Sequence, residues 1–229
     1  AMTYSKSYYR PAHAIKLITL EYIVPRITLL LHPESVCDLG CGDAMTLRSF
    51  AKHGVKLVQG FDASIMDKAD YFINPKYLSL GVDFSDPNFS ISERYDLAIS
   101  LEVAEHLEEK CSEKFVDLCT SASDCVLFSA ALPGQLSATH INNQPGYYWR
   151  GKFDARGYVE IDFIRPEIAF KGELYWPYRQ NMTLFVHHEK LRNTPALLEI
   201  YEKYRQNEGQ ERIVPISEWV LSNILMGRF

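Results

Sequence analysis

Short apolar runs alternate with stretches of helical periodicity from His32 onward. Strands that are apolar along their whole length and separated by helices are typical of a parallel sheet buried on both faces. Right-handed crossovers between such strands give a doubly wound structure, so we predict an α/β, Rossmann-like fold with helices on both faces. The predicted strands are 35–39, 56–61, 76–82, 95–101 and 125–131, and the predicted helices between them are 44–53 and 104–121.

The segments that flank this alternating region have a different pattern. Residues 8–31 carry apolar residues at helical spacing, and Pro11 and Pro25 predict two short helices there, because proline interrupts a helix. After Pro133, a loop rich in glycine, proline, asparagine and aromatic residues leads to a predicted helix near 147–156. Further predicted elements are two late strands at 158–164 and 182–187 and two charged helices at 195–206 and 216–226.

The length of 229 residues predicts one domain, 1–229, with a core at about 33–190, N-terminal helices at 8–31 and a C-terminal helical tail at 191–229. Hydrophobic residues make up 47% of the chain, which indicates a folded core. The net charge is −5 and no basic run occurs, so nucleic acid and anionic membranes are not expected partners.

The location expected from the sequence is cytoplasmic. No apolar run approaches the roughly 20 residues of a membrane-spanning helix, and the first residues lack the features of a secretory signal peptide. The five cysteines are odd in number and include no Cys-x-x-Cys pair, which favours buried reduced thiols.

The most informative motif is a strand that runs into Gly40-Cys41-Gly42 and then into a helix. Glycine provides unusual backbone angles and lets a ligand lie against bare backbone, although a tight turn without a ligand would show the same pattern. Asp38 lies two positions before the first glycine. A carboxylate at that position suits a ligand that presents a positive amine.

Acidic residues also end the next two predicted strands. Asp62 lies 20 residues after Gly42, where a carboxylate can accept two hydrogen bonds from a ribose diol. Asp83 and Phe84 offer an acceptor and an apolar ring to an adenine base, although an aspartate that caps the following turn would look the same. Because the carboxyl ends of parallel strands meet at one edge of a sheet, these residues predict a single ligand crevice.

A nicotinamide dinucleotide is a weaker candidate for this crevice. Its fingerprint requires Gly-x-Gly-x-x-Gly, and Met45 occupies the third glycine position. Asp43 lies at the start of the predicted helix, where a carboxylate would repel a pyrophosphate. The expected ligand is therefore a nucleoside without phosphates.

Together these motifs resemble the class I S-adenosylmethionine-dependent methyltransferases over about residues 33–190, with 95–107 similar to the fourth-strand motif of many small-molecule members. Many relatives carry a third glycine where this chain has Ala44, a residue that is small enough to leave room for the methionine moiety. The resemblance implies a seven-stranded sheet with an antiparallel last strand, S-adenosyl-L-methionine as cofactor and S-adenosyl-L-homocysteine as product. It implies cofactor contacts at Asp38, Gly40, Cys41, Gly42, Asp62, Ala63, Asp83, Phe84, Leu101 and Glu102.

Two histidines are candidates for the catalytic base. Methyl transfer from a sulfonium is an in-line displacement, in which the enzyme positions the nucleophile and removes its proton. His140, in the loop after the fifth strand, is the first choice, because His106 belongs to the motif that shapes the cofactor pocket and packing there is its alternative role. A solvated loop is the alternative for His140. No metal site is expected, because the other histidines lack ligand spacing with acidic partners.

Polar amides and aromatic rings follow His140 and predict an acceptor surface. This segment also resembles members from bacterial surface-glycan and natural-product pathways, whose acceptors tend to be sugars or other small hydroxylated molecules. Arginines near Trp176 and Tyr178 are either solvated or recognise a phosphate or carboxylate on the acceptor. The predicted acceptor residues are Asn142, Asn143, Tyr147, Trp149 and Arg150, and the further arginines are Arg156, Arg165 and Arg179.

The predicted function is O-methylation of a small, carbohydrate-like or phosphorylated acceptor in bacterial surface polysaccharide biosynthesis. One alternative is methyl transfer to nitrogen or to a phosphate-derived, phosphoramidate-type group. An alternative of another class is a noncatalytic nucleoside-binding or scaffolding protein, which would leave His106 and His140 without a role. The expected partner is a small-molecule acceptor, and a homodimer is an arrangement left open.

Overall fold

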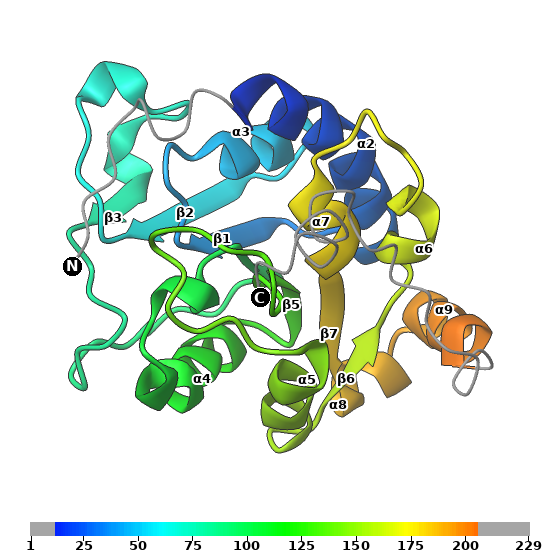
Figure 1. Ribbon diagram of the computed structural model, residues 1–229. Coiled ribbons are helices and arrows are strands. Elements are labelled where there is room, and N and C mark those ends of the chain that lie inside the picture. The colour runs from blue at the N-terminus through cyan, green and yellow to red at the C-terminus, as the bar shows by residue number, and fades with distance from the viewer. Residues whose placement is uncertain (1–11, 206–229) are drawn as a thin grey trace.

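The computed structural model describes residues 12–205, which form a seven-stranded sheet with helices on both faces (Figure 1). Its strands are β1 (Ser35–Leu39), β2 (Leu57–Asp62), β3 (Leu78–Leu80), β4 (Leu97–Leu101), β5 (Cys125–Ser129), β6 (Tyr158–Ile161) and β7 (Thr183–His187). The strand order is β3-β2-β1-β4-β5-β7-β6, in which the first five strands are parallel and β7 is antiparallel to both neighbours. The predicted α/β class and the antiparallel late strand are confirmed.

Alternate residues of the central strands pack into two cores on opposite faces of the sheet. In β4, Leu97 and Ile99 belong to one core and Ala98 to the other, as expected for a strand buried on both faces. The first face is covered by α2 (His13–Leu31), α3 (Met45–Lys52), α6 (Ile164–Ile168), α7 (Trp176–Asn181), α8 (His188–Arg192) and α9 (Pro195–Arg205). The second face is covered by α4 (Ser112–Ala122) and α5 (Gly146–Asp154).

The prediction of a helix break at Pro25 is wrong. α2 is one helix of 19 residues with Pro25 inside it. A proline in a helix interior costs about 3 kcal/mol, but each fully buried aliphatic side chain contributes about 1.5–3 kcal/mol. Ile23, Val24 and Ile27 are buried on both sides of the proline, so packing outweighs the interruption. The predicted residues 8–11 lie outside the described part of the chain.

The prediction of a continuous helix at 104–121 is also wrong in its first half. Two 3-10 turns, η4 (Ala104–His106) and η5 (Glu109–Cys111), precede α4. The backbone oxygen of Glu105 accepts hydrogen bonds from the N–H groups of Ile141 (2.9 Å) and Asn142 (3.0 Å). This segment is therefore bonded to the loop after β5, and its carbonyl is not used within an α-helix.

Smaller differences lie at element ends. β3 has only three residues and follows the 3-10 turn η3 (Pro75–Tyr77), and β6 ends at Ile161, before α6 begins. α7 was not predicted, and the predicted helix 216–226 lies outside the described residues.

No helix within residues 12–205 has the length and apolar character to cross a membrane. All five cysteines are buried and free, as predicted.

Candidate active site

A cavity of about 1030 Å³ lies at the carboxyl ends of the central strands. Cavities that hold a drug-sized ligand have volumes of roughly 300–1,000 Å³, so this one can hold a nucleoside-sized molecule and a small second molecule. All ten predicted cofactor residues, together with His106 and His140, line it. We call the part around Gly40 and Asp62 the cofactor end and the part around His106 and His140 the histidine end.

The turn after β1 requires glycine at its first position. Gly40 has a φ of +89°, and a Cβ atom there would lie 2.4 Å from the Cγ2 of Val103. Its N–H donates to the backbone oxygen of Phe61 at the end of β2 (2.7 Å). Ala44, in the position of the third glycine, adopts the left-handed conformation with a φ of 64°. The chain therefore keeps the glycine-type backbone there at the steric cost of a methyl group.

Asp62 at the end of β2 fixes this turn. Its two carboxylate oxygens accept hydrogen bonds from the backbone N–H groups of Gly42 and Ser64, each at 2.7 Å. A carboxylate has about four lone-pair sites, so Asp62 can accept from a diol in addition to these bonds. Burial raises the pKa of Asp62, while these hydrogen bonds lower it. The side chain thus connects the glycine turn to the next strand.

Asp38 lines the same cavity and is buried, with 3% of its surface exposed. Burial raises its pKa well above the usual range, and the negative charges of Asp62 and Asp43 raise it further, while Lys16 lowers it. Asp43 caps the start of α3, where its Oδ1 accepts from the N–H of Met45 (3.2 Å). Its Oδ2 lies 2.6 Å from the Nε2 of a helix α2 residue, His13. A carboxylate therefore occupies the position that a pyrophosphate would need.

Asp83 and Phe84 lie at the rim and base of the cavity. The Oδ1 of Asp83 accepts from the N–H (2.8 Å) and hydroxyl (2.6 Å) of Ser85, and these bonds lower its pKa. This is the turn cap that the sequence left as an alternative. The ring of Phe84 is buried and packs edge-on against Phe115, with 5.3 Å between the ring centroids. Both residues still line the cavity.

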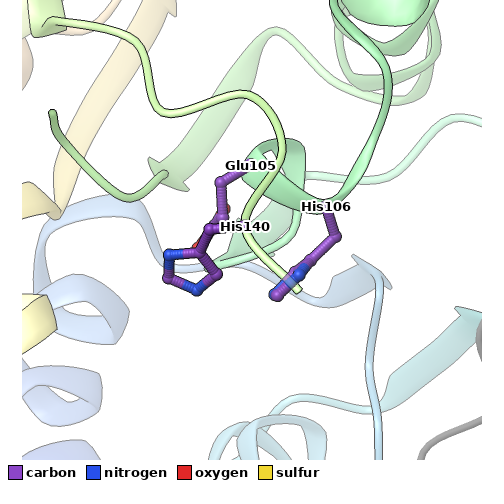
Figure 2. Close-up of side chains that lie close together, drawn as sticks. All are labelled: Glu105, His106 and His140. Carbon is purple, nitrogen blue, oxygen red and sulfur yellow. The ribbon is translucent and has the colours of Figure 1, made fainter. Parts of the chain in front are cut away.

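Two imidazole rings meet edge-to-face at the histidine end, with centroids 5.0 Å apart and an angle of 75° between the ring planes. His106 comes from the η4 turn and His140 from the loop after β5 (Figure 2). The Nδ1 of His106 lies 3.0 Å from the backbone oxygen of Thr139, and the Nδ1 of His140 lies 2.7 Å from that of Gln135. Burial lowers the pKa of His106. The structure thus brings together the two histidines that the sequence singled out.

Two glutamates lie beside these histidines. Glu102 has a positive φ of 59°, and its carboxylate accepts from the Nδ2 of Asn181 (3.1 Å). Glu105 is fully buried, and neither of its carboxylate oxygens has a hydrogen-bond partner within the described residues. Burial raises the pKa of both carboxyl groups. Acid groups with such surroundings are concentrated at functional sites.

Comparisons with known proteins show which relatives and which fold this chain resembles. No protein-family model matches the chain. The ubiquinone biosynthesis O-methyltransferase of Coxiella burnetii is 30% identical over 104 residues, which cover 44% of this chain and 43% of the relative. The chain therefore spans less than half the length of the curated relatives that it matches.

Solved structures share the fold at low sequence identity. A sugar N-methyltransferase from Streptoalloteichus superposes with a TM-score of 0.59 at 11% identity, over 82% of this chain and 94% of that one. The magnesium protoporphyrin IX methyltransferase of Synechocystis, with bound S-adenosylhomocysteine, has a TM-score of 0.51 at 16% identity, over 75% of this chain and 82% of that one. This chain has the class I methyltransferase fold. The predicted family resemblance is confirmed at the level of the fold, and another structure of the Synechocystis protein holds S-adenosylmethionine, the expected cofactor.

The predicted acceptor residues are not at the cavity of this methyltransferase fold. Asn142 is buried and donates to the Oγ of Ser112 (3.1 Å), and the ring of Trp149 packs in the core against Phe128. These side chains make hydrogen bonds to the loop or pack in the core, because α5 lies on the second face of the sheet. Of the other three, Asn143 donates to the backbone oxygens of Leu132 and Gln135, Tyr147 is 72% exposed, and Arg150 pairs with Glu160, and none of the five lines the cavity.

The arginines that were candidates for phosphate recognition have partners within the protein. Arg156 pairs with Glu113 and Asp117, and Arg165 pairs with Glu160 and Asp162. Arg179 donates to the backbone oxygen of Ala169, and no arginine of residues 12–205 lines the cavity. The expectation of an arginine site for an acceptor phosphate or carboxylate is therefore not supported.

Several cavity residues of the methyltransferase fold were not identified as such from the sequence. Lys16 of α2 points its Nζ over the ring of Tyr175, 5.1 Å from the centroid. Burial lowers the pKa of this lysine, against the opposing effect of Glu102 and other cavity carboxylates. The sequence signal was its spacing of four residues from Leu20, which puts both on one helix face. Others include Gln135 and Tyr175, for which the local pattern gives no signal, whereas Trp176 and Tyr178 were noted in the sequence only as neighbours of the candidate arginines.

Proposed function

We propose that this chain is an S-adenosylmethionine-dependent methyltransferase that transfers the methyl group to an oxygen atom of a small hydroxylated acceptor. The observation that carries the proposal is one cavity with two chemically different ends. The glycine turn, Asp38 and Asp62 suit the amine and ribose of the cofactor, and the imidazoles of His106 and His140 suit an acceptor hydroxyl. The volume accommodates both molecules at once.

The reaction is a displacement at the methyl carbon. A bond forms between the acceptor oxygen and the methyl carbon as the bond from that carbon to sulfur breaks, and the sulfonium becomes a neutral thioether. The hydroxyl proton goes to the Nε2 of His140. A backbone carbonyl can only accept, so the Nδ1 of His140 carries the hydrogen toward Gln135, and Nε2 of the neutral ring carries the lone pair.

The cavity also supports a narrower choice of acceptor. The name of the Coxiella relatives favours oxygen as the methylated atom. The aromatic residues Tyr175, Trp176 and Tyr178 line the cavity and support a ring-shaped acceptor, which we propose is a sugar-like molecule of surface polysaccharide biosynthesis. A phosphorylated acceptor has less support, because the candidate arginines are paired elsewhere. Five free thiols fit a reducing, cytoplasmic setting.

Calorimetry tests the cofactor part of the proposal. We expect specific heats of binding for S-adenosylmethionine and S-adenosylhomocysteine and none for NAD, because Asp43 occupies the helix start that a pyrophosphate requires. Specific binding of NAD, or no binding of either methionine derivative, would overturn the proposal.

Turnover assays test the acceptor part. Hydroxylated sugars and matched amino sugars are supplied as acceptors, and the position of the methyl group in the product is found by NMR. Oxygen methylation supports the proposal, and transfer only to nitrogen overturns its choice of atom. Cofactor binding without transfer to any acceptor favours a noncatalytic nucleoside-binding protein. Light scattering in the same buffers tests the open prediction of a homodimer.

A further inference from the structure

Three residues with metal-ligand atoms meet at the histidine end of the cavity. Glu105, His106 and His140 each offer one ligand atom, and these atoms lie within 4.8 Å of one another (Figure 2). Within residues 12–205, no other group of three histidine, cysteine, aspartate or glutamate residues meets this spacing. The two histidines line the cavity and Glu105 lies beneath them, so an ion among the three would lie at the cavity surface.

The carboxylate of Glu105 lacks a partner that would stabilise its charge. The residue is 0% exposed, and neither oxygen makes a hydrogen bond within the described part of the chain. Burying an ionised carboxylate is costly unless it is paired or coordinates a metal.

Both imidazoles are held in an orientation that suits metal binding. A ligating histidine almost always donates its second ring N–H to a carbonyl or carboxylate, which fixes its tautomer and ring plane. His106 and His140 both place Nδ1 against a backbone oxygen, so Nε2 carries the lone pair in each neutral ring. The loop that carries His140 is fixed by the Nδ2 of Asn143, which donates to the backbone oxygens of Leu132 and Gln135 at 3.0 Å.

We infer that Glu105, His106 and His140 bind one divalent transition-metal cation, of the class of Zn²⁺, Mn²⁺ and Co²⁺. Two imidazoles with one carboxylate suit these ions, whereas Mg²⁺ and Ca²⁺ prefer oxygen ligands. Three protein ligands leave positions open toward the cavity, as in catalytic metal sites. This differs from the expectation that the chain has no metal site.

With the cation bound, the ion replaces His140 as the group that activates the acceptor, and this part rests on the proposed function. An acceptor hydroxyl bound to the ion loses its proton more readily, as water does on a bound metal. The proton then goes to solvent water, and the Nε2 of His140 is a ligand and does not take the proton. The bond changes at the methyl carbon stay the same.

Calorimetry on the chelator-treated 229-residue chain tests the binding. We expect Zn²⁺, Mn²⁺ or Co²⁺ to bind with one equivalent per chain, and Mg²⁺ to bind at least tenfold more weakly. Bound Co²⁺ should give visible absorption bands of a site with nitrogen and oxygen ligands. The variants Glu105→Gln and His140→Ala should each weaken binding at least tenfold, because each removes a ligand.

The matched control is His53→Ala. The Nδ1 of His53 also lies near a backbone oxygen, that of Ser49 at 2.8 Å, but His53 is outside the cluster. Loss of the His53 side chain should leave the affinity for Zn²⁺, Mn²⁺ or Co²⁺ unchanged. A second control, His188→Ala, tests adventitious binding at the neighbouring pair His187 and His188.

The outcomes separate this inference from the proposed function. Binding of S-adenosylhomocysteine and the circular dichroism spectrum show whether each variant is folded, and if Glu105→Gln unfolds, His140→Ala alone decides. No stoichiometric binding of Zn²⁺, Mn²⁺ and Co²⁺ to the wild type, or unchanged affinity in the folded variants, overturns the metal site. Turnover without metal then leaves His140 as the base. Metal binding without any S-adenosylmethionine binding overturns the proposed function and leaves the metal site standing.

Discussion

The two ends of the cavity are stabilised in different ways. At the cofactor end, the contacts join residues that are close together in the chain, since the carboxylate of Asp62 accepts from the backbone N–H groups of Gly42 and Ser64. The histidine end is assembled from segments that are far apart in the chain, namely 102–106, 135–140 and 175–181. It contains Glu105, a buried carboxyl group without a hydrogen-bond partner in the described residues.

This difference indicates what each end requires from a ligand. Buried polar groups are almost always hydrogen-bonded, and the carboxylate of Asp62 already has its partners within the protein. The geometry of the cofactor end is therefore formed before any ligand is bound. The histidine end has groups whose interactions are incomplete, and a bound molecule or ion can complete them. Changes at the cofactor end should therefore affect folding and cofactor affinity together, whereas loss of His140 at the histidine end should mainly affect turnover.

Gly40→Ala should have the largest effect, at the cofactor end. The added Cβ would lie 2.4 Å from Val103, at a φ of +89°. Overpacking and left-handed strain predict a loss of about 2–4 kcal/mol in the free energy of unfolding, measured by urea denaturation, together with loss of S-adenosylmethionine binding. Gly151→Ala in α5 is the control, because its Cβ would meet no atom within 4 Å, and it should retain full stability. Equal stability of the two variants would contradict a tight turn.

His140→Ala tests the other end. We expect turnover to fall by about 10²-fold or more, the usual contribution of a positioned base, while S-adenosylmethionine affinity changes by no more than about twofold. His106→Ala should lower turnover less and cofactor affinity more. Steady-state kinetics and calorimetry measure the two quantities, with His53→Ala as the control. Near-native turnover of His140→Ala would remove this residue from the reaction.

Asp62→Ala and Asp83→Ala compare two carboxylates within the cofactor end. Asp62 is 6% exposed and holds two backbone N–H groups, whereas Asp83 is exposed. Loss of a hydrogen bond to a charged group predicts that Asp62→Ala weakens cofactor binding by about 1.5–3 kcal/mol in calorimetry. Asp83→Ala should have a smaller effect. A larger effect at Asp83 would show that the exposed carboxylate is the main contact.

Cofactor affinity should depend on pH through Asp38. Burial, and then the charges of Asp62 and Asp43, raise the pKa of Asp38, so the neutral acid is favoured in the unliganded fold. A positive amine pairs with the ionised form, so the affinity for S-adenosylmethionine should rise as pH increases through the raised pKa. Without ligand, the folded protein binds the proton of Asp38 more strongly than the unfolded chain does. The free energy of unfolding should therefore fall as pH rises from the pKa of Asp38 in the unfolded chain to its raised pKa in the fold. Asp38→Asn should bind more weakly and without this pH dependence.

Ala44→Gly should have the smallest effect. Ala44 has a φ of 64°, so glycine removes left-handed strain of about 1 kcal/mol but loses about 0.5–1 kcal/mol through chain entropy. The two terms nearly cancel, and stability and cofactor affinity should stay close to wild type. Ala51→Gly, in the ordinary backbone of α3, gains no strain relief and should lose about 1 kcal/mol in urea denaturation. Equal losses in both variants would mean that Ala44 is not strained.

The cofactor end could be predicted because its signals are local. An apolar strand, the Gly40 turn and Asp62 occur within one short stretch, and both the backbone angle and the close contact with Val103 require glycine. The parallel strands have a clear pattern for a similar reason, since burial on both faces makes them apolar throughout.

The histidine end could be predicted only in part, because distant contacts decide it. The carbonyl of Glu105 bonds to the N–H groups of Ile141 and Asn142, and this replaces the expected helix with a turn. Trp149 has the residue type of a ligand contact, but α5 places it in the core. The roles of His106 and His140 stay predictions, although both lie where the sequence suggested.

The hydrogen bond from the N–H of Tyr175 to the hydroxyl of Thr19 (2.7 Å) has a consequence for the order of folding. It joins a helix that precedes the first strand to a segment 156 residues later, and both segments supply walls of the cavity. Long-range contacts form late because the chain entropy of closing the loop must be overcome first. A growing chain that has paired only β1 and β2 already contains the glycine turn, but the wall made by Tyr175 cannot form until that residue has been synthesised. The binding cavity is therefore a late product of synthesis, although its most recognisable motif is an early one.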